Sequence, residues 1–270
     1  MRIDQDCRAL VTGGSSGIGK AIATSLARSG AKVGIVARDP VRLAHAKAAI
    51  EAASSKGADV ATFAADVSDD AAVAALADAV RRRMGGVDLL VHSAGITHPA
   101  AAVDTDLATY RALMATNYFG AVAVTKAFLD EMIARRRGHI VAISSVAGFL
   151  GVYGYTGYSA SKFALAGFLE CLRQEVRPHG IGVTLVFPGD TDTPQLAAEN
   201  LTKPEPTRVL GANVPVLAPE VVASATLDGV RQNRAEVLPG AHAQGVRLAS
   251  RIAPSLVRWW MDRAVARVSR

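Results

Sequence analysis

The chain has 270 residues, half of them apolar and a fifth charged, with a formal net charge of +6. This composition is typical of a folded globular protein and excludes intrinsic disorder, while no apolar run reaches the roughly 18–20 residues of a bilayer span. The N-terminal segment lacks the apolar centre of a signal peptide, and Cys7 and Cys171 fit neither a metal site nor a disulfide framework. We therefore expect a cytoplasmic protein without a metal.

Short β-branched runs alternate with longer helical patterns along most of the chain. The expected strands are Ala9–Thr12, Lys32–Ala37, Val60–Ala65, Asp88–His92, His139–Ser144 and Gly182–Phe187. Helices are expected to begin near Ile18, Pro40, Ser68, Thr105 and Tyr158. Several strands are apolar on both faces, as in a parallel sheet covered by helices on each side. The alternation predicts a single-domain α/β protein, a Rossmann-type doubly wound parallel sheet with ligands at the carboxyl ends of the strands.

The first strand runs directly into a glycine-rich loop, TGGSSGIG, at residues 12–19. Glycines let the backbone turn sharply and approach a diphosphate, which then lies at the positive end of the following helix. A plain turn is the alternative, but the position between the first strand and the first helix favours a dinucleotide site. The expected contacts are Gly13, Ser15, Ser16, Gly17, Ile18 and Gly19.

Two residues at strand ends bear on the choice of dinucleotide. Arg38 follows the second strand, where a basic side chain can pair with a 2′-phosphate, so it favours NADP(H) over NAD(H). The adjacent Asp39 weakens this prediction, and a solvated surface arginine is the alternative. Asp66 ends the third strand, where it can accept a hydrogen bond from the adenine amino group. Its alternative is an acid at a helix start beside Ser68.

A tyrosine and a lysine stand one helical turn apart at Tyr158 and Lys162. A phenol with a pKa near 10 is a usable acid at neutral pH, and we expect the lysine charge to lower that pKa. Tyr158 can then give a proton to a carbonyl oxygen as hydride reaches the carbon, while a hydroxyl of Ser144 or Ser145 holds the same oxygen. Asn117 lies within a helix, an unfavourable place unless its side chain has a task. Without the glycine loop, an amphipathic tyrosine and a snorkelling lysine would explain the pair equally well.

These motifs resemble the short-chain dehydrogenase/reductase family over nearly the whole chain. The matching residues are Thr12-Gly13-x-x-x-Gly17-x-Gly19, Asp66, Ala94-Gly95, Asn117, Ser145, Tyr158-x-x-x-Lys162 and Pro188-Gly189. The resemblance implies that Ser145 positions the substrate oxygen, Tyr158 is the acid/base, and Asn117 anchors a water chain for the proton. It implies that Lys162 holds the nicotinamide ribose and that Thr191 or Thr193 contacts the carboxamide. The other implied cofactor contacts are Val67, Ala94, Gly95, Pro188 and Gly189.

One loop departs from the family pattern. His92 and Ser93 stand where the family usually has two asparagines, which affects the expected hydrogen bonds of that loop but not the chemistry. The resemblance also implies a homodimer or homotetramer.

The segment Phe187–Leu210 gives narrower evidence, because it resembles the group of 3-ketodihydrosphingosine reductases. The order Asp-Thr-Asp-Thr-Pro, Glu-Asn, Thr-Lys-Pro and Thr-Arg is kept, although Gly189 stands where many of that group have proline. The resemblance implies NADPH-dependent reduction of the 3-keto group of a long-chain amino ketone. Another carbonyl substrate (a 3-oxoacyl thioester or a steroid) is the alternative enzyme function, and a dinucleotide-binding scaffold is the non-enzymatic one.

The distal part of the chain is expected to cover the active site and to carry a separate tail. Residues 190–218 are interpreted as a substrate lid, with an ordinary surface loop as the alternative. We expect a catalytic domain over residues 1–245 and a basic amphipathic tail over residues 246–270. The tail arginines are Arg247, Arg251, Arg258, Arg263, Arg267 and Arg270.

The tail is expected to form a helix from Ser255, with Arg258 and Asp262 opposite an apolar arc. The arc consists of Val257, Trp260, Met261, Ala264, Val265 and Val268. Such a helix is typical of a peripheral membrane contact, here on the cytoplasmic face, and equally of a contact between subunits. Nucleic-acid binding is not expected, because no recognition fold surrounds the arginines.

Overall fold

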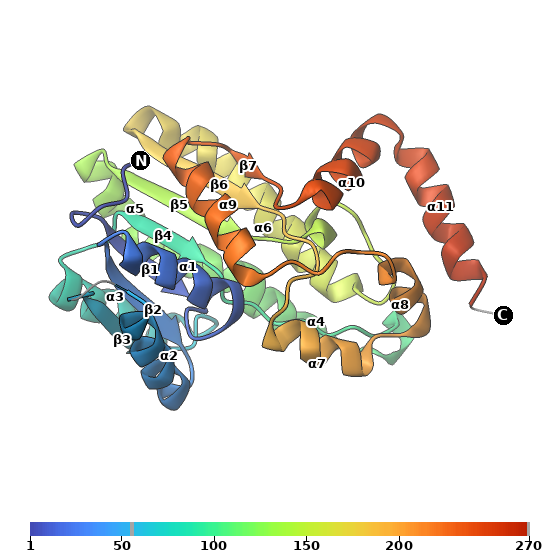
Figure 1. Cartoon of the computed structure of the whole chain (residues 1–270), viewed down its shortest axis with the longest axis horizontal. Helices are drawn as coiled ribbons and strands as arrows, with labels where there is room; N and C mark the ends of the chain where they lie inside the picture. Colours follow the sequence, from blue (N-terminus) through green and yellow to red (C-terminus); the bar gives the residue numbers. More distant parts are fainter. Residues whose placement is uncertain (55–56, 269–270) are drawn as a thin grey trace.

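The fold is a seven-stranded parallel sheet in the order β3-β2-β1-β4-β5-β6-β7, in a computed structural model that describes residues 1–54 and 57–268 (Figure 1). The strands are β1 Arg8–Thr12, β2 Lys32–Ala37, β3 Val60–Ala64, β4 Leu89–His92, β5 Gly138–Ile143, β6 Ile181–Val186 and β7 Glu236–Val237. The strand order reverses between β1 and β4, which creates the topological switch point at which such sheets bind ligands. The predicted doubly wound α/β fold is confirmed. The two-residue strand β7 was not predicted, because it is too short to show a pattern.

Helices cover both faces of this sheet. They are α1 Gly17–Arg28, α2 Pro40–Ala52, α3 Asp70–Met84, α4 Leu107–Met114, α5 Gly120–Arg135, α6 Thr156–Val176, α7 Pro194–Thr202, α8 Glu205–Gly211, α9 Pro219–Arg231, α10 Ala241–Ile252 and α11 Pro254–Ala266. Side chains of α1, α2 and α9 pack in the core on one face, and those of α3, α5 and α6 pack on the other. The five predicted helix starts lie within two residues of the observed ones.

Helices α4 and α5 are joined by a single π turn, Ala115–Phe119, into one helix of 29 residues. Among the described residues it is the one helix long and apolar enough to cross a membrane. Val124, Phe128 and Met132 are nevertheless fully buried in the hydrophobic core. These contacts are those of a core helix.

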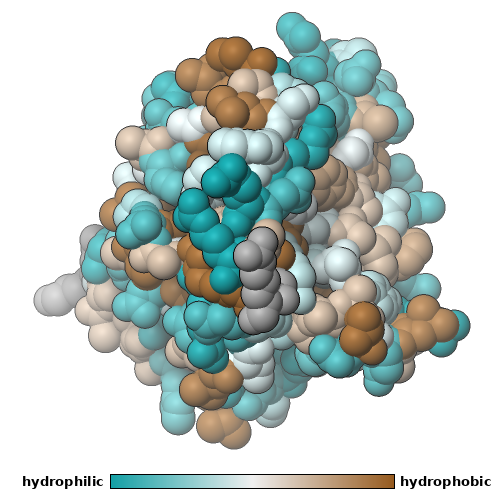
Figure 2. All heavy atoms as spheres, turned by 90° about the vertical axis from the view of Figure 1, so that its right-hand side faces the viewer, coloured by the Kyte–Doolittle hydropathy of each residue, from teal (hydrophilic) through white to brown (hydrophobic). Residues whose placement is uncertain are grey.

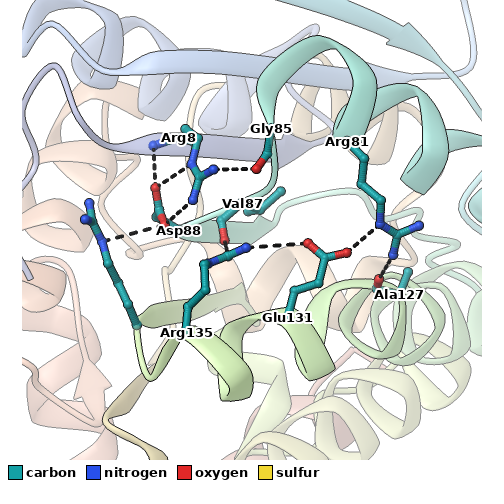
Figure 3. Close-up of polar contacts among 9 residues, drawn as sticks. Arg8, Arg81, Gly85, Val87, Asp88, Ala127, Glu131 and Arg135 are labelled. Carbon is teal, nitrogen blue, oxygen red and sulfur yellow. Dashed lines mark hydrogen bonds and ion pairs between the residues drawn. The ribbon is translucent and has the colours of Figure 1, made fainter.

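A network of ion pairs joins the start of β1, the residue before β4 and helices α3 and α5 (Figure 3). Asp88, which is 1% exposed, accepts hydrogen bonds from Arg8 Nε and Nη2, each at 2.8 Å, and lies 3.6 Å from Arg137 Nε. Arg81 bonds to Glu131 across the two helices. A charge this deeply buried is stable only when it is paired, so the network fixes β1 beside β4. The opposite, carboxyl ends of these strands carry the candidate site.

The C-terminal helices α10 and α11 extend beyond β7, with α11 placed opposite α8 (Figure 1). Arg247 of α10 donates to both carboxylate oxygens of Glu236 in β7, at 3.0 and 2.8 Å. Its guanidinium carbon also lies 4.7 Å from the centroid of the Phe149 ring, a cation–π contact. The boundary predicted between residues 245 and 246 falls inside α10, and a separate tail unit stays a prediction.

Candidate active site

A cavity of about 880 Å³ runs along the carboxyl ends of the central strands. The glycine-rich loop lies at one end, and α7, α8, α10 and α11 form the wall at the other end. The predicted site residues that line it are Gly13, Ser15, Ser16, Gly17, Ile18, Arg38, Asp66, Val67, Ala94, Gly95, Ser145, Tyr158, Lys162, Pro188, Gly189, Thr191 and Thr193. Only Gly19 and Asn117 of the predicted set do not line the cavity, and both support residues that do.

The glycine-rich loop has the conformation and the close contacts that glycine alone permits. Gly13 and Gly17 have positive φ angles of 68° and 51°. A Cβ atom at Gly13 would lie 2.7 Å from the Ala94 backbone nitrogen, and one at Gly19 would lie 2.4 Å from the Gly13 carbonyl oxygen. Gly19 therefore supports the loop from beneath, and side chains at these positions would displace the loop from the strand ends.

The loop after β4, in which His92 and Ser93 depart from the family pattern, is held by Thr12. The Thr12 hydroxyl oxygen accepts hydrogen bonds from the backbone N–H groups of Ser93 and Ala94, each at 3.2 Å. The side chain of His92 points into the core, where its Nε2 lies 2.8 Å from the Thr125 hydroxyl. The loop after β4 therefore stays next to the glycine-rich loop, although His92 and Ser93 differ from the family pattern.

Asn117 occupies the π turn of the long helix and is 1% exposed. Its Oδ1 accepts from the Ile96 N–H at 2.8 Å, and its Nδ2 donates to the Ile96 carbonyl and to the Ser161 hydroxyl, both at 2.9 Å. The π turn, a feature often found at functional sites, thus ties the loop after β4 to α6. A Cβ at Gly95 would lie 3.2 Å from Asn117 Oδ1 and 3.5 Å from Lys162 Nζ. Asn117 is therefore adjacent to the site that it supports.

Tyr158, Ser145 and Lys162 lie together at the centre of the cavity wall. Ser145, two residues after β5, lines the cavity beside Tyr158 and lowers the pKa of its hydroxyl. Lys162 Nζ donates to the Ile143 carbonyl at 2.9 Å and lies 5.6 Å from the centroid of the Tyr158 ring. The side chains that the sequence singled out for proton transfer are thus brought together.

The expected direction of the tyrosine pKa is wrong in this structure. Burial raises the pKa of Tyr158 above its usual value, and the Glu199 carboxylate raises it further, against the lowering effect of hydrogen bonds from Ser145 and Gln195. The charge of Lys162, whose Nζ lies 5.6 Å from the centroid of the Tyr158 ring, does not outweigh the effect of burial. Burial also lowers the pKa of Lys162 to about 8. At neutral pH Tyr158 therefore keeps its proton and is ready to donate it.

A second polar group faces the cavity, and sequence analysis did not assign it to the site. It is defined here as the Glu199 cluster and consists of Tyr155, Asp190, Gln195, Glu199 and Lys203. Glu199, which is 8% exposed, accepts from the Tyr155 hydroxyl at 2.6 Å and from Gln195 Nε2 at 3.1 Å. Lys203 Nζ lies 3.8 Å from the Glu199 carboxylate and 3.7 Å from that of Asp190. The spacing of four residues between Gln195, Glu199 and Lys203 is visible in the sequence and could have indicated this cluster. The contact with Tyr155 could not have been predicted in this way.

The acids that follow β2 and β3 at the edge of the cavity already have local partners. Asp39 caps α2 by accepting from the N–H groups of Val41 and Arg42, at 2.8 and 3.1 Å. Asp66 accepts from the Ser68 N–H and hydroxyl, at 2.9 and 2.7 Å. Because Asp39 is engaged as a helix cap, it counts less against a phosphate beside Arg38 than the sequence suggested.

Two arginines line the same end of the cavity. The side chain of Arg38 is 68% exposed and lies 3.9 Å from Asp66. Arg42, from the first turn of α2, also lines the cavity and was not predicted as a site residue. Arg42 Nε lies 3.7 Å from Asp39, and two arginines lining the same end of a cavity suit an anionic group such as a phosphate.

The far wall of the cavity is apolar and includes the C-terminal helix. Leu210 and Val214 contribute from the lid segment, and Val257, Trp260 and Met261 contribute from α11. Of the predicted apolar arc, Ala264 is buried, Val257, Met261, Val265 and Val268 are half-buried, and Trp260 is 55% exposed. The arc therefore faces the protein body more than the solvent, with Arg258 and Asp262 exposed as predicted. Arg270 lies outside the described residues.

The chain is similar to known proteins over most of the residues that line this cavity. The family model for "short chain dehydrogenase" matches residues 8–204. The chain belongs to the short-chain dehydrogenase family. This short-chain dehydrogenase is 42% identical over 227 residues to the "3-ketodihydrosphingosine reductase" of Bos taurus, which covers 83% of this chain and 68% of the bovine protein.

Solved structures of the family have the same fold. Levodione reductase aligns with a TM-score of 0.82 and 28% identity, covering 90% of this chain and 99% of the other. A short-chain dehydrogenase from Burkholderia cenocepacia, solved in complex with NADP, aligns with a TM-score of 0.80 and 25% identity, covering 97% of this chain and 99% of the other. The short-chain dehydrogenase described here is therefore an oxidoreductase that acts on a carbonyl or alcohol group.

Proposed function

We propose that this short-chain dehydrogenase reduces the 3-keto group of a long-chain amino ketone, 3-ketodihydrosphingosine, with NADPH. The observation that carries the proposal is a single cavity in which Ser145 and Tyr158 adjoin an apolar wall made by α8 and α11. A polar reacting centre next to a long apolar surface suits a substrate with one polar end and an alkyl chain. The likeness to the bovine enzyme, by its name a 3-ketodihydrosphingosine reductase, supports the same substrate.

The glycine-rich loop and the two arginines fit NADPH at the other end of the cavity. The loop residues from Gly13 to Ile18 surround the place for a diphosphate at the start of α1, and Arg38 with Arg42 suits the 2′-phosphate. Asp66 is assigned to the adenine amino group, Lys162 to the nicotinamide ribose, and Thr191 or Thr193 to the carboxamide. The remaining contacts are assigned to Ser15, Ser16, Val67, Ala94, Gly95, Pro188 and Gly189. When bound, NADPH supplies the hydride that the carbonyl carbon receives.

The residues of the chain then handle the oxygen and its proton. Ser145 and Tyr158 hydrogen-bond the carbonyl oxygen, which fixes the carbonyl group in the cavity. Because the pKa of Tyr158 is raised by burial, its hydroxyl is protonated at neutral pH and passes that proton to the oxygen as negative charge develops there. Lys162 and Asn117 both lie next to Gly95. We assign these two residues to the return of a proton to Tyr158.

A substrate panel tests this function. The purified protein is assayed for NADPH and NADH oxidation with 3-ketodihydrosphingosine, a 3-oxoacyl thioester and a steroid ketone. We expect turnover with the long-chain amino ketone and a preference for NADPH. Turnover with the thioester or the steroid alone would support the alternative function, and no oxidation with any carbonyl would support a scaffold.

We also propose that α10 and α11 touch the cytoplasmic face of a membrane, from which a lipid ketone can enter the cavity. The exposed apolar side chains there are Leu248, Ile252, Leu256, Trp259 and Trp260, and they stand among exposed arginines. Figure 2 faces this side, where brown hydrophobic residues lie between teal hydrophilic ones. A surface of this kind suits the interface of an anionic bilayer.

Flotation with vesicles tests the membrane contact. Replacing Leu248 and Ile252 by serine should reduce binding to anionic vesicles, whereas Val41→Ser, which alters a similarly exposed valine on α2, should not. Unchanged flotation together with a smaller assembly in light scattering would favour a contact between subunits instead. A homodimer or homotetramer is our proposal for the assembly, supported by the half-exposed Phe119 and Phe163.

A further inference from the structure

The Glu199 cluster does not itself carry the proton in the transfer described above, although it faces the same cavity and Glu199 raises the pKa of Tyr158. Glu199 is 8% exposed, in a part of the protein where an unpaired carboxylate would be unfavourable. Its oxygen Oε2 accepts a hydrogen bond from the Tyr155 hydroxyl and forms an ion pair with the Lys203 ammonium at 3.8 Å, and Oε1 accepts a hydrogen bond from the Gln195 amide. A carboxylate offers about four acceptor positions, so these three donors leave room on Oε1 for one more.

The charges within the cluster do not balance. Lys203, whose side chain is 10% exposed, stands between the carboxylates of Glu199 and Asp190, at 3.8 and 3.7 Å. One ammonium between two carboxylates leaves one formal negative charge, in a chain whose overall charge is +6. Charges interact more strongly in a partly dehydrated cavity than in water, so this place favours a cationic group of a ligand.

The cluster also lies within one side chain of the reacting centre. Gln195 lines the same cavity as Tyr158 and lowers the pKa of that tyrosine, and its Nε2 donates to Glu199 Oε1 at 3.1 Å. The rings of Tyr155 and Tyr158 have their centroids 5.6 Å apart. In a 2-amino ketone the ammonium is on the carbon next to the carbonyl. A substrate whose carbonyl oxygen is bound by Tyr158 therefore presents its ammonium to the neighbourhood of Glu199.

We propose that Glu199, with Asp190 behind Lys203, binds the ammonium group of the substrate and so selects 2-amino ketones over uncharged ketones. This inference rests on the proposed function and deepens it, because it names the residue that recognises the amine. Tyr155 and Gln195 act as positioning residues that hold the carboxylate in place, whereas Lys203 competes with the substrate ammonium for it. The competing interpretation is that Glu199 only fastens α7 to the residues before α6.

The test compares two substrates of equal chain length, 3-ketodihydrosphingosine and the 1-hydroxy-3-ketone that lacks its amine. The wild-type protein should prefer the amino ketone in kcat/KM. In Glu199→Gln this preference should fall by about 10- to 100-fold, mainly through a higher KM for the amino ketone, because a charge-assisted hydrogen bond is lost. Glu199→Asp keeps the charge and should recover part of the preference. Glu205→Gln, which alters an exposed acid of α8, is the matched control and should keep the wild-type ratio.

A second variant keeps the inference falsifiable if Glu199→Gln does not fold, which NADPH binding reports. Lys203→Met leaves two carboxylates without their ammonium and should increase the preference for the amino ketone. Equal losses with both substrates in Glu199→Gln, or an unchanged ratio in both variants, would overturn the inference while leaving the proposed function intact. A wild-type protein that reduces neither long-chain ketone would overturn the proposed function and the inference with it.

Discussion

The guanidinium carbon of Arg247 lies 4.7 Å from the centroid of the Phe149 ring. Phe149 ends the short helical turn that begins after Ser145. The same guanidinium donates twice to Glu236 of β7. One arginine thus holds the C-terminal helices against the sheet and against the segment that carries Ser145. From the sequence, Arg247 was expected only as one of the arginines of the basic tail, whereas in the structure it is partly buried and holds α10 against β7.

Removing this contact should weaken the binding of long-chain substrates. In Arg247→Ala we expect α10 and α11 to lose their fixed place, so that KM for the long-chain ketone rises by about 10-fold, the equivalent of one charge-assisted contact. Steady-state kinetics with a short-chain ketone provides the comparison, because a short chain does not reach the wall made by α11. Arg258→Ala alters an exposed tail arginine and serves as the control. Equal effects on both chain lengths would contradict the assignment.

Arg38 should decide between the two dinucleotides. In Arg38→Ala the Kd of NADPH should rise by about 10-fold, since a contact with the 2′-phosphate is lost, while the Kd of NADH should change by less than about 2-fold. Titration of cofactor fluorescence measures both constants. Arg208→Ala, on the exposed side of α8, should change neither. A parallel loss of affinity for both dinucleotides would show that Arg38 does not recognise the phosphate.

The buried Asp88 should make a large contribution to stability. Asp88→Asn removes the partner of Arg8 and should lower the free energy of unfolding by about 2 kcal/mol. Asp228→Asn breaks the exposed pair with Arg231 and should cost less than about 0.5 kcal/mol. Denaturant titration compares the two variants. Equal losses would contradict the role given to the buried network.

The contribution of Asp88 to the free energy of unfolding should depend on pH. Burial alone would raise its pKa, but the hydrogen bonds and charge of Arg8 and the charge of Arg137 hold the pKa below its usual value. The contribution is therefore present at neutral pH and is lost as the pH falls below about 4. The difference in stability between the wild type and Asp88→Asn should become smaller in that range.

His92 should make the protein sensitive to mild acid. Burial lowers the pKa of His92 to about 3, and its Nδ1 has no hydrogen-bond partner among the described residues. An unfolded histidine takes up its proton near pH 6.5, so stability is complete above that pH and falls as the pH decreases toward the folded value. When the pH is lowered from 7 to 5, the free energy of unfolding should fall by about 2 kcal/mol less in His92→Asn than in the wild type. Denaturant titrations at the two pH values measure this difference. Identical pH dependence would show that His92 is not buried in its neutral form.

The parts of the site that could be predicted from sequence are those specified locally. The glycine-rich loop and the pair of Tyr158 and Lys162 each occupy a few consecutive residues, so their spacing is visible in the sequence, and the loop favoured a catalytic interpretation of the pair. Asn117 could be singled out because a helix interior disfavours asparagine. The predicted substrate lid over residues 190–218 contains two ordered helices, and its mobility stays a prediction.

Features that depend on distant contacts could not be predicted. The Glu199 cluster requires Tyr155, which is 44 positions away in sequence. The raised pKa of Tyr158 depends on burial and on Glu199, and neither is visible in a four-residue spacing. Similarly, the hydrophobic pattern of α11 indicated an apolar face but not that this face turns toward the cavity.

The central claim is that the hydroxyl of Tyr158 delivers the proton during carbonyl reduction. Its most direct test is the single-turnover rate of Tyr158→Phe with saturating NADPH and 3-ketodihydrosphingosine, together with the Kd of NADPH. We predict a rate about 10³-fold below that of the wild type, with the Kd changed by less than about 3-fold, because only the transferable proton is removed. A rate within a few-fold of the wild type would contradict the claim.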